Sequence, residues 1–209
     1  MLTGSEWTIF LLLCLTMSLT PGPNMLYLTS RALCQGPRAA VISLWGTAAG
    51  FVLHTLLAAT GVSALLRTTP GALDVLRYAG AAYFFWLAWK IIRPGAGGFQ
   101  TVPLPEETSG RLFRMGFTVN ALNPQAVLLY LSIFTQFVRP ERGSVLGQSL
   151  VLGGTQTVIS FAVNLLIILA AGGLTGWFAR KPGAFRVQRL AMGGVLAVLA
   201  LRLVATGRF

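Results

Sequence analysis

Residues 7–30 read WTIFLLLCLTMSLTPGPNMLYLTS, and no charged side chain occurs in this stretch. A helix needs about 20 mainly apolar residues to cross the roughly 30 Å of hydrocarbon in a bilayer, so the stretch can span a membrane. Its middle contains two prolines, a glycine and an asparagine in succession. Because proline removes a helical hydrogen bond and its ring clashes with the preceding turn, the sequence predicts a transmembrane helix that is interrupted near its centre.

The composition of the whole chain is also that of a membrane protein. Of its 209 residues, 55% are hydrophobic and only 10% are charged, whereas soluble domains carry about 25% charged residues. The apolar content excludes a disordered chain. The net charge is +11, but the basic residues are scattered singly between apolar runs, so nucleic-acid binding is not expected. We expect an all-α integral membrane protein whose basic loops contact membrane lipid.

Five further stretches are apolar enough to be transmembrane helices, at residues 39–66, 73–92, 115–138, 143–179 and 190–205. The third and sixth spans are the weakest, because their uncharged cores hold only about a dozen residues. A signal peptide is the alternative for the first span. It is disfavoured because no Lys or Arg precedes Trp7 and no small-residue cleavage pattern follows the apolar run. The sequence therefore predicts six transmembrane helices.

Residues 94–110, PGAGGFQTVPLPEETSG, form a predicted linker with three prolines and four glycines. The linker separates residues 1–93 from residues 111–209, and each half contains three predicted spans. Because three is odd, the second half is expected to be inverted in the membrane relative to the first, as in many transporters. The leading span of each half is interrupted, the second at Asn123-Pro124. We expect two inverted three-helix repeats with interrupted helices 1 and 4.

The distribution of basic residues predicts the orientation. Ten of the 16 Lys and Arg residues flank the connections after the first, third and fifth spans, and six flank the other side. The positive-inside rule places the richer side, including the linker, in the cytoplasm. Both termini are then expected outside it.

The interruptions are the candidate binding site. The prolines should deprive the carbonyls of Met17, Leu19 and Asn120 of their helical donors. Orphan carbonyls are costly in hydrocarbon, so such backbone is buried in protein or lines a cavity. There the carbonyls can bind a cation and the restarting half-helix can bind an anion, which together suit a zwitterion. An ordinary proline kink is the alternative. The candidate substrate-binding residues are Pro21, Gly22, Pro23, Asn24, Asn120, Asn123, Pro124, Gln156 and Tyr83.

Several polar residues in the spans have two interpretations. His54 is the only histidine and lies near the middle of the second span, so it is the candidate for proton coupling, although a neutral packing histidine fits equally well. Gln156 and Asn164 lie eight residues apart and can line one path or hydrogen-bond between helices. Tyr83 is equally compatible with packing between helices and with lining the substrate cavity.

The motifs resemble one family over nearly the whole chain. Pro21-Gly22-Pro23-Asn24, the basic stretch Ser30 to Arg38, Gly46 to Gly50 with His54, Gly80 to Tyr83, and Asn120 to Pro124 are similar, in this order, to the lysine-exporter (LysE/RhtB) family of amino-acid efflux proteins. The resemblance implies a small inner-membrane exporter of amino acids or their derivatives, and the direction of transport follows from it alone. Two residues depart from the family pattern, Ala88 in place of a glycine and Gln125 in place of a frequent lysine.

The charge pattern narrows the substrate. Asp74, at the start of the third span, is expected to pair with Arg77 at the interface. No Asp or Glu lies in the middle of any predicted span, so a basic side chain would lack a counter-ion in the low-dielectric site. A neutral amino acid, such as homoserine, threonine or leucine, is therefore favoured over a basic one. Proton antiport is expected, with His54 as the titratable group.

Other classes of function fit the sequence less well. His54 with Thr55 or Ser43 has no acid to complete a catalytic group, so an enzyme is not expected. Two cysteines and one histidine do not predict a metal site, and no cofactor is expected. A membrane scaffold without transport, or a transporter of another small solute, stays open as an alternative. The expected partners are an amino acid and lipid, with a homo-oligomer possible.

Overall fold

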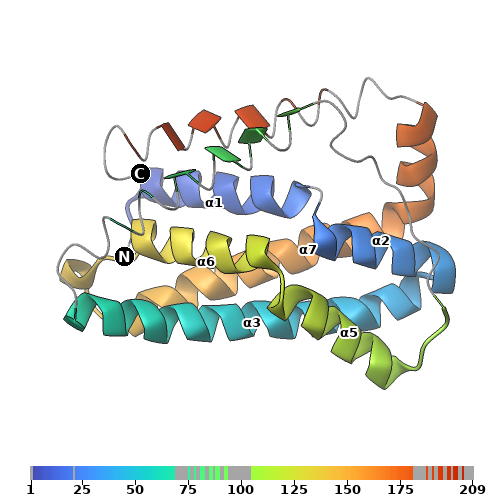
Figure 1. Cartoon of the computed structure of the whole chain (residues 1–209), viewed down its shortest axis with the longest axis horizontal. Helices are drawn as coiled ribbons and strands as arrows, with labels where there is room; N and C mark the ends of the chain where they lie inside the picture. The colour runs from blue at the N-terminus through green and yellow to red at the C-terminus, as the bar shows by residue number, and fades with distance from the viewer. Residues whose placement is uncertain are drawn as a thin grey trace.

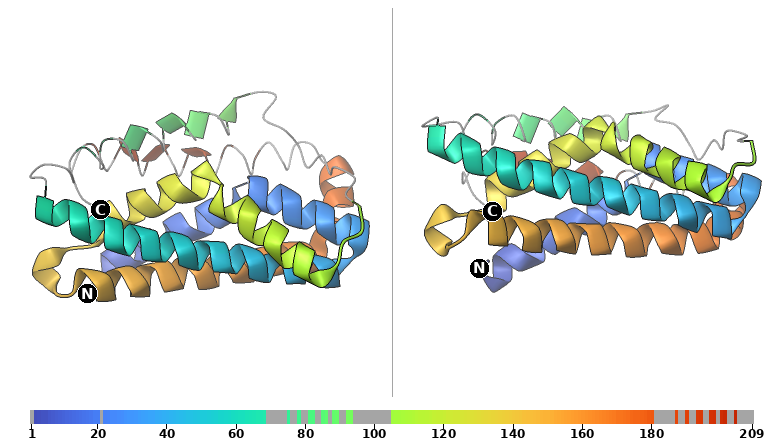
Figure 2. Two further views of the ribbon diagram at one scale, coloured as in Figure 1. Left: turned by 60° about the horizontal axis from the view of Figure 1, so that its bottom comes forward. Right: turned by 90° about the horizontal axis from the view of Figure 1, so that it is seen from below.

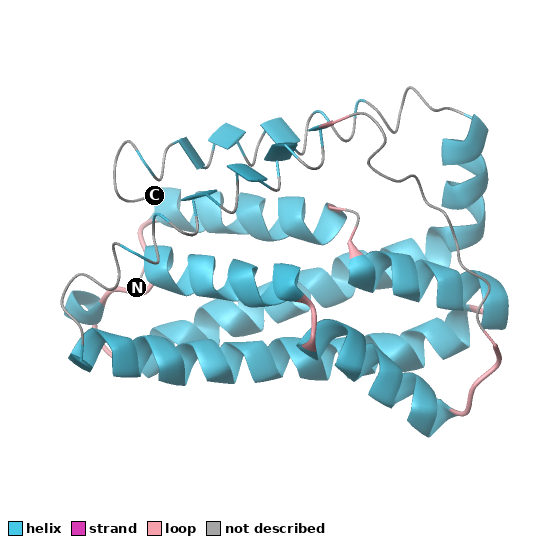
Figure 3. Cartoon of the chain, viewed as in Figure 1, coloured by secondary structure: helices cyan, strands magenta, loops and turns pink. Residues whose placement is uncertain are grey.

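The computed structural model describes residues 2–20, 22–68 and 105–180, with single residues between 75 and 93 and between 187 and 204. All regular structure in the described residues is helical, and no strand occurs among them (Figure 3). The all-α class predicted from the apolar runs is therefore confirmed. The helices are α1 (Gly4–Leu19), α2 (Pro23–Gln35), α3 (Pro37–Thr68), α5 (Ser109–Ala121), α6 (Pro124–Phe137), the short 3₁₀ helix η1 (Pro140–Arg142) and α7 (Val145–Arg180).

Two long continuous helices, α3 and α7, and two broken helices, α1–α2 and α5–α6, form the bundle. Figure 1 shows α1 and α6 side by side in one half of the molecule and α2 and α5 in the other. The long helices α3 and α7 run past both halves, and the rotated views of Figure 2 show the same arrangement. α3 packs against α2, α5, α6 and α7, and α7 packs against α1 and α2. Each broken helix is thus supported along its length by continuous ones.

The long helices have the length and apolarity of membrane spans. Residues Pro37–Gly61 of α3 have a mean hydropathy of 1.6, and residues Val145–Ala171 of α7 have 1.8. The pair α1 and α2 also qualifies when it is taken as one span bent by 50°. The described residues therefore contain two or three candidate spans. Most residues of the predicted spans at 73–92 and 190–205 and most of the linker lie outside the described residues, so the six-helix inverted repeat stays a prediction.

Both leading helices are interrupted where the prolines predict. α1 ends at Leu19 and α2 begins with Pro23, while α5 ends at Ala121 and α6 begins with Pro124. A proline at the first position of a helix costs no hydrogen bond, because that N–H has no partner inside the helix. Each proline therefore ends one helix and starts the next.

The crossing of α3 and α5 is close because a glycine stands on each side of it. A Cβ atom on Gly46 would lie 2.8 Å from the Phe117 nitrogen, and one on Gly116 would lie 2.9 Å from the carbonyl carbon of Ser43. The backbones of the two helices are therefore in direct contact. Small residues allow such close approach between helices in membranes, where dispersion contacts replace the hydrophobic driving force.

A buried ion network closes the end of the bundle where α1 begins. The carboxylate of Glu6 accepts hydrogen bonds from Arg139 at 3.1 Å and from Arg142 at 2.6 Å. Glu6 is buried and also completes a capping box with Thr3 at the start of α1. The network thus fixes the beginning of α1 to the connection between α6 and α7.

The opposite end is held by α2 and the end of the linker. Gln35 donates to the Glu107 carbonyl at 2.8 Å and accepts from the Glu107 N–H at 3.1 Å. Arg31 donates to the Pro105 carbonyl at 2.6 Å, and its side chain is 0% exposed. α2 continues beyond the predicted end of the first span at Ser30 to Gln35, so Arg31 lies within the helix and its guanidinium bonds the end of the linker.

Candidate functional site

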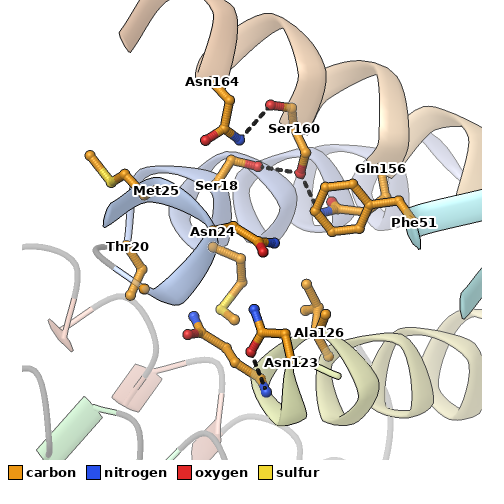
Figure 4. Close-up of a pocket in the computed structure, with 14 residues that line it drawn as sticks. Ser18, Thr20, Asn24, Met25, Phe51, Asn123, Ala126, Gln156, Ser160 and Asn164 are labelled. Atoms are coloured by element: carbon orange, nitrogen blue, oxygen red, sulfur yellow. Dashed lines mark hydrogen bonds between the residues drawn. The ribbon is translucent and has the colours of Figure 1, made fainter. Parts of the chain in front are cut away.

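The two helix interruptions face one cavity together with the middle of α7. The cavity has a volume of about 50 Å³, and Figure 4 shows the side chains around it. Its lining residues are Met17, Ser18, Thr20, Gly22, Asn24, Met25, Phe51, Asn123, Gln125, Ala126, Leu129, Gln156, Ser160 and Asn164. Segments about a hundred residues apart in the sequence therefore form a single site.

At the α1–α2 break, the start of α2 is left without a side-chain cap. Gly22 precedes the helix in an extended conformation and no side-chain hydrogen bond caps it. Pro23 has no N–H, and the first intrahelical bond runs from the Leu26 N–H to the Gly22 carbonyl at 3.0 Å. The N–H groups of Asn24 and Met25 precede that bond, so they have no carbonyl acceptor within the helix. The positive end of the α2 dipole thus borders the cavity.

At the α5–α6 break, Asn123 satisfies the start of α6. Its side-chain oxygen accepts from the Gln125 N–H at 3.0 Å, and its carbonyl accepts from the Ala126 N–H at 3.0 Å. Such a cap uses the donors that a ligand would otherwise meet. The two breaks are therefore chemically different, since α6 is capped by its own chain and α2 is not.

His54 binds the backbone of the α5–α6 break rather than the cavity. Its Nε2 lies 3.0 Å from the Asn120 carbonyl oxygen, which also accepts from the Asn123 N–H at 2.9 Å. Because a carbonyl can only accept, Nε2 carries a proton. His54 is buried, and its ring centroid lies 5.7 Å from that of Tyr130.

Two of the carbonyls predicted to be orphaned have donors. The Asn120 carbonyl, which Pro124 deprives of its helical partner, is bound by His54 and Asn123. The Met17 carbonyl accepts from the Thr20 N–H at 3.3 Å. The prediction of orphans is wrong at these two positions because the backbone tightens after each helix end, and at one of them a second helix supplies a donor.

The α7 wall of the cavity consists of amides and hydroxyls connected by hydrogen bonds (Figure 4). Gln156 donates from Nε2 to the Ser160 hydroxyl at 2.9 Å, and that hydroxyl lies 2.8 Å from the Ser18 hydroxyl on α1. Asn164 donates to the Ser160 carbonyl at 2.7 Å. Ser18 and Ser160 were missed by sequence reasoning. The signal was the four-residue spacing from Gln156 to Ser160, which places both on one face of a helix.

Two amide oxygens at the cavity lack hydrogen-bond partners. They are Oδ1 of Asn24 and Oε1 of Gln156, both buried. Gln156 is only 1% exposed, so solvent does not satisfy its oxygen. Buried polar atoms in proteins are nearly always bonded, so these two oxygens mark the wall as a place where a hydrogen-bond donor can bind.

The structure brings together only part of the predicted site. Gly22, Asn24, Asn123 and Gln156 line the cavity, and Pro23 and Pro124 begin the two half-helices beside it. Asn120 does not line it.

The Asn120 amide is instead fully buried against α3. A Cβ on Gly50 would lie 2.6 Å from its Oδ1. The predicted site residues Pro21 and Tyr83 lie outside the described residues.

The cavity can bind a small polar molecule that carries no net charge. None of its lining residues is ionisable, and the described residues contain no cluster of metal-binding side chains. A volume of about 50 Å³ accommodates a few water molecules. A larger solute can therefore enter only when the surrounding helices separate.

Comparisons with known proteins give one family model and several similar efflux proteins. The family described as "LysE type translocator" matches residues 15–207. The chain is 30% identical over 208 residues to a protein of Salmonella typhimurium named "Homoserine/homoserine lactone efflux protein", covering 99% of each chain. It is 28% identical over 202 residues to the "Leucine efflux protein" of Salmonella choleraesuis, covering 94% of this chain and 93% of the other. No solved structure matches the chain significantly.

Proposed function

The chain belongs to the LysE type translocator family, and from this premise we propose that it exports neutral amino acids across the inner membrane. Amino acids of the homoserine, threonine or leucine type are the proposed substrates. The printed names of the two relatives support this substrate class. The long apolar helices α3 and α7 support a location in the membrane.

One structural observation carries the proposal. Both helix interruptions and the amides of α7 converge on a single cavity inside the bundle. Interrupted helices expose backbone donors and acceptors at membrane depth, and transporters use them to bind substrates and ions. A scaffold protein has no need of such a site, because every unsatisfied polar group in it costs stability.

The chemistry of the cavity favours a neutral amino acid over a basic one. Its lining residues contain no Asp or Glu, so a lysine or arginine side chain would be buried without a counter-charge. Met17, Phe51 and Leu129 instead give apolar surface to an uncharged side chain.

We propose proton antiport with His54 as the proton carrier. Its Nε2–H bonds the Asn120 carbonyl beside the α5–α6 break, so a second proton would place a positive charge next to that break. A change of charge there can favour one arrangement of the broken helix over another. This link between protonation and the break is the reason to expect coupling.

The proposed architecture is the pair of inverted repeats, residues 1–93 and 111–209, with both termini outside the cytoplasm. The broken helices α1–α2 and α5–α6 would be the leading helices of the two repeats. The α2–α3 turn and residues 105–108 lie at the same end of the bundle in Figures 1 and 2. This placement supports assigning both connections to the same side of the membrane.

Counterflow in liposomes tests the function. The purified protein is reconstituted, and exchange of radiolabelled homoserine, threonine, leucine and lysine is measured at symmetric pH and with an imposed pH gradient. We expect exchange of the neutral amino acids, loss of exchange in Asn24→Ala, and normal exchange in the control Thr155→Val, whose hydroxyl donates to the Val151 carbonyl of its own helix.

Proton coupling is tested separately with His54→Gln. The glutamine amide can still donate to the Asn120 carbonyl but cannot take up a proton. We expect exchange at symmetric pH to persist and acceleration by the gradient to disappear. Gradient-driven transport that survives in His54→Gln would exclude His54 as the carrier. A folded protein that exchanges none of the amino acids would favour the scaffold or another solute.

A further inference from the structure

We propose that Gln156 recognises the α-ammonium group of the substrate through its side-chain oxygen, and that Ser160 and Ser18 hold the amide in that orientation. The inference rests on the proposed function and specifies which group of the site binds the substrate's ammonium. It concerns three side chains on α1 and α7, of which two were not suggested by the sequence.

Gln156 offers the cavity one atom only. Its Nε2 donates to the Ser160 hydroxyl at 2.9 Å, so the donor half of the amide is occupied. Its Oε1 is buried without a partner, and the residue lines the cavity. A buried acceptor beside a cavity is complementary to a ligand that carries N–H or O–H groups. An ammonium group is the strongest such donor in an amino acid.

The serines bind the end of the Gln156 amide that does not face the cavity. When the Ser160 oxygen accepts from Gln156, its own proton can go to the Ser18 oxygen 2.8 Å away. Gln156 then donates to Ser160 and Ser160 donates to Ser18, so every hydrogen bond of the chain points from α7 toward α1. Reversing the Gln156 amide would require each hydroxyl to turn as well. The serines are therefore positioning residues, since they act through Gln156.

The start of α2 supplies the complementary half of a zwitterion site. The N–H groups of Asn24 and Met25 at the uncapped start of α2 can receive a carboxylate or a carbonyl oxygen. The Asn24 side-chain oxygen is a second free acceptor. In Figure 4 Asn24 lies between the Ser18–Ser160–Gln156 chain and Asn123. The α6 start does not compete for the anion, because Asn123 already caps it.

Neutral amide oxygens also explain why the site would prefer a neutral amino acid to a basic one. A carboxylate in the site would not give this preference. They bind one ammonium without adding a net negative charge to the site. A second cationic group on the substrate therefore finds no counter-ion among the lining residues. The ammonium common to all amino acids is recognised, and a basic side chain is not.

Competition with modified substrates tests the assignment. The best-exchanged neutral amino acid of the panel is competed with its methyl ester, which keeps the ammonium, and with its N-acetyl derivative, which lacks it. In the wild type we expect the ester, which carries a net positive charge, to compete more weakly than the parent. We expect the N-acetyl derivative to compete at least about tenfold more weakly than the parent, since hydrogen bonds to charged groups are strong.

Variants of Gln156 and Ser160 test whether these residues cause the preference for the parent over its N-acetyl derivative. Gln156→Leu should weaken binding of the parent about 10- to 100-fold and abolish the preference over the N-acetyl derivative. Gln156→Glu, which keeps an acceptor oxygen, should retain the preference. Ser160→Ala should reduce the preference several-fold, because the amide can then rotate, and Thr155→Val should leave it unchanged.

The outcomes separate this inference from the proposed function. An unchanged preference in Gln156→Leu, with transport intact, would overturn the role of Gln156 and leave the function standing. Absence of exchange in the wild type would overturn the function itself. If Gln156→Leu binds too weakly for exchange, the same ratio is obtained from equilibrium binding of the labelled parent to purified protein. A variant that keeps the wild-type ratio in that assay also overturns the assignment.

Discussion

The contact between α3 and α5 makes a sharp prediction for Gly116→Ala. In the wild type, the backbone of α5 at Gly116 lies directly on the Ser43 carbonyl of α3. The same crossing holds Thr47, whose hydroxyl lies 3.4 Å from the Gly116 carbonyl, and His54, which binds the Asn120 carbonyl one turn further along α5. A methyl group inserted here should separate the two helices and disturb the break beside the cavity.

The structure sets the size of the effect. A Cβ on Gly116 would lie 2.9 Å from the Ser43 carbonyl carbon and 3.1 Å from its Cα, whereas ordinary contact begins at 3.4 Å. These are backbone atoms, so no side chain can rotate away. Overpacking costs about 1–3 kcal/mol, and replacing a helical glycine by alanine returns about 0.5–1 kcal/mol. We expect a net loss of about 1–2 kcal/mol, which lowers the melting temperature of a chain this long by about 2–8 °C.

Thermal unfolding in detergent and counterflow in liposomes provide the assay. The matched control is Gly61→Ala, which makes the same substitution in α3 where no atom of the described residues lies within 4 Å of the new Cβ. The control should be as stable as the wild type or slightly more stable. We expect Gly116→Ala to melt lower and to exchange amino acids more slowly. Equal melting temperatures and equal transport for the two variants would refute the close crossing.

Three further predictions concern other parts of the fold. Glu6→Gln leaves the buried Arg139 without its carboxylate and should cost about 3 kcal/mol, seen as a large drop in melting temperature; an unchanged melting temperature would contradict the network. Asn123→Ala removes the cap of α6 and should cost about 1 kcal/mol, whereas Asn123→Asp should melt near the wild type, and equal losses would argue against capping. A membrane-impermeant maleimide should label the exposed Cys34 in inverted vesicles but not in intact cells, and should spare the buried Cys14 in both; labelling of Cys34 in intact cells would reverse the predicted orientation.

The sequence predicted the features that depend on local chemistry. The apolar runs give helices long enough for a membrane because each helix satisfies its own backbone hydrogen bonds. The interruptions at Pro23 and Pro124 follow from the missing N–H and the rigid ring of proline, which act within one turn. The absence of acids from the middle of the predicted spans, and hence the preference for a neutral substrate, can also be read directly from the residues.

Tertiary packing decided how the polar atoms at the two interruptions are used. The two Pro-Asn or Asn-Pro motifs look alike in the sequence, yet Asn123 caps α6 while the Asn24 side-chain oxygen stays free at the cavity. His54 donates to the Asn120 carbonyl because α3 and α5 cross closely.

The alignment of Ser18 with Ser160 likewise brings together residues 142 positions apart. Hydrogen bonds between distant segments depend on the distance and rotation of packed helices, which periodicity in one segment does not encode. The sequence by itself therefore determined that this protein has broken apolar helices suited to a neutral solute. Only the tertiary structure decided which atoms face the cavity, because that choice is made by the partners that each polar group finds across the bundle.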